Sequence, residues 1–283
     1  MEISYYPGCT LKGSARELDD SFRSVSQRLD IDLKELADWT CCGASSAHLM
    51  DGYLETALPA ADLMIAQAAG LDVVAPCAAC HVRMKAAAQR LSNNGELKAQ
   101  FPFTGEIRIL SGLEMLADEG PFRLIPGRVT KPLTGLRVVP YYGCLAVRPP
   151  EVVEPDDPEN PMQMDRILEA LGAEVVAWPY KTDCCGGSLT LTRTDLVLKL
   201  SRKLIDMAIL VEADAMVTFC PMCQANLDTR QAEISEQTGQ LYRMPVLYLT
   251  ELMGLAFGHP GVGSWLSKHL VPAEKTLRKR GLL

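Results

Sequence analysis

The chain has 283 residues, enough for one large domain or two ordinary ones with a buried core. Its net charge of −7 implies no broad basic surface, which argues against nucleic acid as a partner. Its most apolar stretches, such as residues 57–70, are interrupted by Pro59 and Asp62 and fall short of the roughly 20 apolar residues of a membrane span, so we expect no direct membrane insertion.

The elements expected in the first half of the chain alternate between strand and helix. Residues 3–6 form a short β-like run, and apolar side chains then recur at helical spacing over residues 18–29. A helix-prone stretch follows over about residues 47–69. Residues 71–75 form a compact apolar strand, and another helix begins near Cys80.

The second half repeats this order of elements. We expect strands and helices in turn over residues 137–142, 163–171, 175–178, 194–211 and 215–219. Residues 121–136 carry prolines and glycines and are the expected linker.

Alternating strands and helices are typical of parallel sheets. The sequence therefore predicts an α/β fold of two similar Rossmann-like halves related by internal duplication, an N-terminal domain over 1–120 and a C-terminal domain over 137–283. In such sheets the ligand sites lie beyond the carboxyl ends of the strands.

Ten cysteines fall into two copies of one pattern: a single cysteine, a Cys-Cys-Gly group and a Cys-x-x-Cys group. The first interval is 31 residues in one copy and 39 in the other, while the second is 34 in both. The two sets are Cys9, Cys41, Cys42, Cys77 and Cys80, then Cys144, Cys184, Cys185, Cys220 and Cys223.

The first residues lack the basic and apolar regions of a secretory signal, so we expect a cytoplasmic protein. In that reducing compartment, clustered cysteines are more often metal ligands or redox groups than disulfides.

Thiolates are soft ligands that suit iron–sulfur clusters, zinc and copper(I). Adjacent cysteines such as Cys41 and Cys42 cannot easily serve one tetrahedral ion, whereas a multinuclear cluster offers them separate metal atoms. Zinc and an ordinary cubane cluster each need about four ligands, so a fifth thiolate is left over. A protein in which one or both sets hold structural zinc, as a scaffold for partners, remains an alternative interpretation.

The pattern of Cys, Cys-Cys-Gly and Cys-x-x-Cys resembles the cysteine-rich CCG domain, and two copies resemble the B subunit of heterodisulfide reductase. The resemblance implies a non-cubane [4Fe-4S] cluster held by all five cysteines of each half. It also implies cleavage of a disulfide, or oxidation of thiols, between the two clusters. The implied partners are a flavoprotein A-type subunit and a small iron–sulfur C-type subunit.

Two departures from the methanogen members of that family concern the substrate. Those members carry His after the first cysteine of the second motif and Pro after the first Cys-Cys pair, where this chain has Leu145 and Gly43. The ligand set stays intact, which favours a relative that acts on another disulfide or thiol. The alternative is an electron-transfer or quinone-linked subunit, as in lactate- and glycolate-oxidising complexes.

Other polar residues carry weaker signals. His81 follows a ligand cysteine and is a candidate proton donor, although a histidine on a helix surface is the simpler interpretation. Lys181 and Asp183 are interpreted as solvated loop residues, and the basic tail after Ser267 as a docking segment or a solvated helix. The sequence has no G-x-G-x-x-G after its first strand, so we expect no flavin or nicotinamide on this chain.

Overall fold

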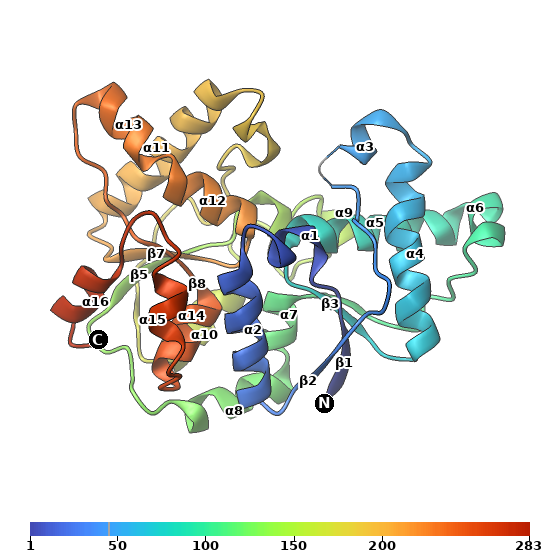
Figure 1. Ribbon diagram of the computed structural model, residues 1–283, viewed down its shortest axis with the longest axis horizontal. Coiled ribbons are helices and arrows are strands. Elements are labelled where there is room, and N and C mark those ends of the chain that lie inside the picture. The colour runs from blue at the N-terminus through green and yellow to red at the C-terminus, as the bar shows by residue number, and fades with distance from the viewer. Residues whose placement is uncertain (45) are drawn as a thin grey trace.

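The computed structural model describes residues 1–44 and 46–283, which form two α/β halves packed side by side (Figure 1). Each half contains a four-stranded sheet, with strand order β2-β1-β3-β4 in the first and β6-β5-β7-β8 in the second. Every neighbouring pair of strands is parallel. The predicted α/β fold with duplicated halves is confirmed.

The inner strands of each sheet lie where the sequence predicted them, whereas the outer strands include some that it missed. The missed strand β2 has the sequence DLKE and is largely exposed, so it carries no apolar pattern. The strands are β1 (Glu2–Tyr5), β2 (Asp32–Glu35), β3 (Val73–Ala75), β4 (Ile109–Ser111), β5 (Arg137–Tyr141), β6 (Glu174–Val175), β7 (Ala215–Thr218) and β8 (Val246–Tyr248).

The helices of the first half connect its strands and extend into the expected linker. They are α1 (Gly8–Lys12), α2 (Arg16–Arg28), α3 (Ala47–Met50), α4 (Leu54–Ala69), α5 (Ala78–Asn93), α6 (Gly95–Gln100), α7 (Gly112–Ala117) and α8 (Glu119–Arg128). The stretch 47–69 is therefore two helices rather than one. They separate at Asp51, whose carboxylate accepts the backbone N–H groups of Tyr53 and Leu54 at 2.7 and 3.1 Å.

The helices of the second half follow the same plan and end in a tail of short helices. They are α9 (Pro150–Val153), α10 (Gln163–Ala170), α11 (Thr194–Leu210), α12 (Pro221–Thr229), α13 (Gln231–Thr238), α14 (Leu249–Ala256), α15 (Val262–Leu266) and α16 (Glu274–Lys279), with 3-10 helices η1 (Cys144–Ala146) and η2 (Gly187–Thr190). None of the helices described over residues 1–44 and 46–283 is long and apolar enough to span a bilayer.

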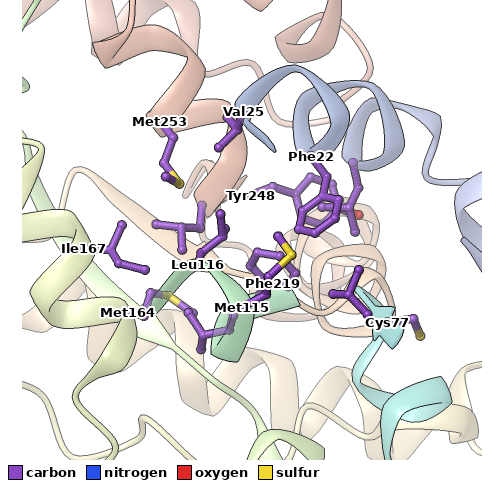
Figure 2. Close-up of a cluster of buried hydrophobic side chains, with 14 of the residues drawn as sticks. Phe22, Val25, Cys77, Met115, Leu116, Met164, Ile167, Phe219, Tyr248 and Met253 are labelled. Carbon is purple, nitrogen blue, oxygen red and sulfur yellow. The ribbon is translucent and has the colours of Figure 1, made fainter. Parts of the chain in front are cut away.

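One hydrophobic core runs through both halves (Figure 2). The ring of Phe22 on α2 meets that of Phe219 edge-on, with centroids 5.9 Å apart. Gly112 lies directly against Phe219, where an added Cβ would lie 2.4 Å from the ring. Beside this contact, the hydroxyl oxygens of Ser21 and Thr250 are 2.7 Å apart. The two sheets are therefore held at a fixed distance from each other.

Candidate metal centres

The five cysteines of each half meet at the carboxyl edge of its sheet. In the first half Cys9 lies on α1 after β1, the pair Cys41-Cys42 follows β2, and Cys77 precedes α5 after β3. The second half repeats this placement after β5, β6 and β7. Because parallel strands all end at one edge, segments that are far apart in the sequence converge there.

The thiols of the first half form a connected group. The Sγ atoms of Cys42 and Cys80 are 3.2 Å apart, and those of Cys41 and Cys9 are 4.0 Å apart. A hydrogen bond from the Cys80 thiol lowers the pKa of Cys42 to about 7, and a hydrogen bond with Cys80 also lowers the pKa of Cys77. These hydrogen bonds favour the thiolate, which is the form that binds metal, at Cys42 and Cys77, and they raise the pKa of Cys80, the donor.

The second half shows the same connections. The Sγ atoms of Cys185 and Cys223 are 3.7 Å apart, and the hydrogen bond between these thiols lowers the pKa of Cys185 to about 7. A hydrogen bond from the Cys144 thiol lowers the pKa of Cys184 to about 6. Cys220 is the N-cap residue of α12, as Cys77 is of α5, so both cysteines lie at helix N-termini, where negative charge is stabilised.

All ten cysteines are free thiols rather than disulfides. In each half the last three cysteines of the pattern are buried, while the first two are exposed or half-buried. In the part of the chain that the structure describes, no three Cys, His, Asp or Glu side chains are disposed to hold a single metal ion.

A glycine in each half makes room beside the last sulfur. Gly8 and Gly143 have φ values of +67° and +70°, a region that glycine adopts readily. An added Cβ on Gly8 would lie 3.3 Å from Cys80 Sγ, and one on Gly143 would lie 2.8 Å from Cys223 Sγ. This open cradle and the five soft donors around it fit an inorganic cluster bound by thiolates.

A tyrosine in each half orders the Cys-Cys loop, a role that was not predicted from the sequence. The Tyr6 hydroxyl donates to the carbonyl oxygen of Thr40 at 2.7 Å, and the Tyr141 hydroxyl donates to that of Asp183 at 2.8 Å. Both acceptors directly precede a Cys-Cys pair. The signal was present in the sequence, because each tyrosine stands three residues before the first cysteine of its set.

Lys181 is buried, so its interpretation as a solvated loop residue was wrong. Its ammonium group lies 2.7 Å from the Asp165 carboxylate, and both side chains are at most 10% exposed. The Lys181 carbonyl oxygen accepts the N–H groups of Tyr142 and Gly143 at 2.9 and 3.1 Å. The two backbone hydrogen bonds tie the second Cys-Cys loop to the loop that carries Cys144, and the ion pair anchors Lys181 to α10. Asp183, by contrast, forms an exposed ion pair with Lys203.

His81 is also buried, with 1% of its surface exposed, so it does not lie on a helix surface. Its Nε2 is 3.1 Å from the Glu114 carboxylate. Burial by itself raises the pKa of Glu114, but His81 and the backbone N–H of Ser111 outweigh it and hold this pKa at about 2. His81 and Glu114 line a cavity of about 160 Å³ that also touches Cys220.

A second cavity, of about 330 Å³, is lined by residues of both halves. From the first half it is lined by Ala79 and Val82 of α5, the helix that carries Cys80. From the second half it is lined by Cys144, Cys184 and Met222. A small molecule in this cavity would therefore touch two cysteines of the second set and the helix that carries Cys80 of the first set.

The fold and these sites define a class of protein: a duplicated α/β chain that gathers five thiols at one edge of each sheet. Residues 3–85 and 138–228 match the cysteine-rich domain CCG, and the chain belongs to this family. Within it the chain is a relative of the B subunit of heterodisulfide reductase, as its duplicated pattern predicted.

Three curated relatives are similar over nearly their whole length. A protein of Wolinella succinogenes called 8-methylmenaquinol:fumarate reductase membrane anchor subunit is 31% identical, over 97% of this chain and 98% of the relative. The B subunit of ferredoxin:CoB-CoM heterodisulfide reductase of Methanosarcina mazei is 29% identical, over 91% and 89%. A protein of Archaeoglobus profundus, named for its likeness to the B subunit of heterodisulfide reductase, is 25% identical, over 91% of both.

A crystal structure of a hypothetical protein from Helicobacter pylori has a similar fold, with a TM-score of 0.73 and 12% identity. The match covers 95% of this chain, which spans about half (52%) of that longer one. With the family membership, the relatives identify the chain as an iron–sulfur electron-transfer subunit of an oxidoreductase that consists of several subunits.

Proposed function

We propose that the chain holds two non-cubane [4Fe-4S] clusters and uses them to reduce a disulfide or to oxidise thiols. One cluster is bound by Cys9, Cys41, Cys42, Cys77 and Cys80, and the other by Cys144, Cys184, Cys185, Cys220 and Cys223. The observation that carries this proposal is the cavity of about 330 Å³ that is lined by Cys144 and Cys184 of the second set and by α5, the helix that carries Cys80 of the first set.

The clusters, when bound, supply one electron each, which together with two protons convert one disulfide into two thiols. The chain itself provides the surroundings of the reacting sulfurs. Ala79, Val82 and Met222 give the cavity an apolar wall that excludes water and favours the carbon arms of a small disulfide. Arg83 lines the same cavity and is held by Glu55 at 2.6 Å, so it offers a fixed positive charge to an anionic substrate.

His81 lines the other cavity, and we therefore leave it out of the proposed reaction. The partners we propose are a flavoprotein A-type subunit and a small iron–sulfur C-type subunit. Relatives named as the B subunit of such a complex support this, as does the lack of a nucleotide-binding motif in the sequence. The cytoplasmic location stays a prediction.

A quinone-linked electron transfer subunit is the second candidate. The relative from Wolinella succinogenes carries 8-methylmenaquinol in its name, and exposed apolar side chains lie beside the cavity. Leu49 and Met50 on α3 are 77% and 82% exposed, next to the lining residue His48. Leu191 is 88% exposed and follows the lining residue Leu189. Such a border would favour the approach of an apolar quinone.

Anaerobic reconstitution separates these functions. We expect about eight irons per chain, and about four or fewer, or zinc in their place, would contradict two complete clusters. Spectra of the loaded protein are then followed while a small disulfide, a thiol or a quinone is added. Changes on adding the disulfide or thiol support the first function. Reoxidation by the quinone alone supports the second function if it is lost in Leu191→Gln. It should be kept in the control Leu241→Gln, which changes another largely exposed leucine away from the cavity.

A further inference from the structure

An imidazole–carboxylate pair lies behind the Cys-x-x-Cys group in both halves, although the sequence shows it in only one. In the first half His81 directly follows Cys80 and is the fourth residue of α5. Its Nε2 lies 3.1 Å from Glu114, the third residue of α7. The Glu114 carboxylate also accepts the N–H of Ser111 at 2.6 Å, which fixes it at the start of that helix.

In the second half the carboxylate is repeated but the histidine is not. Glu251 is the third residue of α14, which follows β8 as α7 follows β4, and it accepts the N–H of Tyr248 at 2.9 Å. The residue after Cys223, the fourth of α12, is Gln224. The position equivalent to His81 therefore carries an amide.

The C-terminal tail supplies the missing imidazole. His269 lies outside the repeat, and its Nε2 is 2.8 and 2.9 Å from the two carboxylate oxygens of Glu251. Its Nδ1 is 2.7 Å from the side-chain amide of Gln224. Gln224, Glu251 and His269 thus form the same kind of imidazole–carboxylate arrangement that His81 and Glu114 form in the first half.

The tail is held against α12 by further contacts. Asp228 of this helix accepts the backbone N–H groups of Leu270 and Val271 at 2.7 and 2.9 Å. Ala273, Leu277 and Leu282 of the tail are buried. From the sequence this segment was expected to be a solvated helix or a docking tail, whereas here it packs onto the helix whose first turn carries Cys223.

Both pairs are buried, so their electrostatic effect is little weakened by water. The side chains of His269 and Glu251 are 1% and 0% exposed, and those of His81 and Glu114 are 1% and 25% exposed. Burial, the largest influence, lowers the pKa of His269, but Glu251 together with Asp228 on α12 and Glu17 on α2 outweighs it and raises this pKa. A hydrogen bond from an imidazole to a carboxylate in such surroundings is strong and well ordered.

We propose that His269 is a positioning residue of the C-terminal centre. In the N-terminal centre the equivalent imidazole, that of His81, directly follows a cysteine in the sequence. In the C-terminal centre the folded tail supplies it. The pair holds Gln224, and with it the adjacent Cys223, and places a fixed charge distribution behind the thiolates. Such neighbours set ligand orientation and redox potential. This inference rests on the proposed two-centre function.

The test compares His269→Gln with His81→Gln in the reconstituted full chain. Iron content and redox titrations followed by electron paramagnetic resonance are the readouts, and Cys80→Ser and Cys223→Ser assign each signal to its centre. We expect His269→Gln to weaken iron retention about 10- to 100-fold and to shift the midpoint potential, at the C-terminal centre alone. His81→Gln should do the same at the N-terminal centre alone. The control His259→Gln, an imidazole stacked on Trp265, should change neither.

The double variant His269→Gln/Gln224→His tests the equivalence of the two positions. It moves the imidazole to the place that His81 holds in the first half, and it should restore the signal and potential of the C-terminal centre. The inference would be overturned if His269→Gln left the iron content and midpoint potential unchanged, or if it changed both centres equally. It would also be overturned if the double variant unfolded at the wild-type temperature but did not restore the C-terminal centre. A wild-type chain without two iron–sulfur signals would instead overturn the proposed function.

Discussion

The substitution Gly143→Ala measures how tightly the chain closes over a proposed ligand sulfur. A φ of +70° costs an alanine about 1–2 kcal/mol. The added Cβ would also lie 2.8 Å from Cys223 Sγ, well inside van der Waals contact. Overpacking of this kind costs a further ~1–3 kcal/mol, and in the loaded protein it displaces a ligand. We therefore expect the free energy of unfolding to fall by about 2–5 kcal/mol in total, and the C-terminal centre to be lost.

Gly239→Ala is the matched control because Gly239 has the same φ of +70° and nothing within 4 Å of an added Cβ. Gly239→Ala should therefore lower the free energy of unfolding only by the cost of an alanine at positive φ, about 1–2 kcal/mol. The effect of alanine on the unfolded chain is common to both variants and cancels in the comparison.

Urea unfolding of the metal-free, reduced protein gives the free energies, and iron counting after reconstitution gives the number of centres. Gly143→Ala should be about 1–3 kcal/mol less stable than Gly239→Ala and should keep roughly half of the wild-type iron. Equal stabilities together with full iron content would show that the thiol of Cys223 is not confined as described.

Two further predictions concern buried charges. Lys181→Met should cost about 3–5 kcal/mol, because it leaves the Asp165 carboxylate buried without its cation. Glu114→Gln should cost about 3 kcal/mol near neutral pH, since lowering the pKa from 4.5 to about 2 is worth about 1.4 kcal/mol per unit. That contribution is complete above the unfolded pKa and is lost as the pH falls towards 2, so the two stability curves should converge on acidification.

The controls are exposed groups of the same kind. Lys34→Met breaks a pair whose side chains are 50% and 56% exposed, so it should destabilise the protein far less than Lys181→Met. Glu119→Gln removes a carboxylate that is 79% exposed and should leave the acid unfolding profile unchanged. These interpretations would be contradicted if Lys181→Met and Lys34→Met lost the same free energy of unfolding. They would also be contradicted if the stability of Glu114→Gln and of the wild type depended on pH in the same way. Chemical and acid unfolding of the metal-free protein provide the measurements.

The sequence predicted the features that repeat and those that are locally apolar. The central strands and long helices follow from hydrophobic periodicity, and α11 starts at the expected residue, Thr194. The ten cysteines were found by spacing alone, and the parallel sheets explain why such distant groups converge. Their role as cluster ligands stays a prediction.

Contacts between residues that are distant and unpatterned were not visible in the sequence. His269 reaches Glu251 only because the tail folds back over α12, and no repeat marks it. Lys181 looked like an ordinary loop residue because its partner Asp165 lies on a helix 16 residues earlier. Exposed edge strands such as β2 lack the alternation by which a strand is recognised.

The close contact of Gly112 with Phe219 has a mechanical consequence. Because an aromatic ring from one half occupies the space left by a missing side chain in the other, the chain has no hinge at this point about which the halves could swing apart. The relative position of the two cysteine sets is therefore set by the packing of the core and does not depend on a movement of one half against the other.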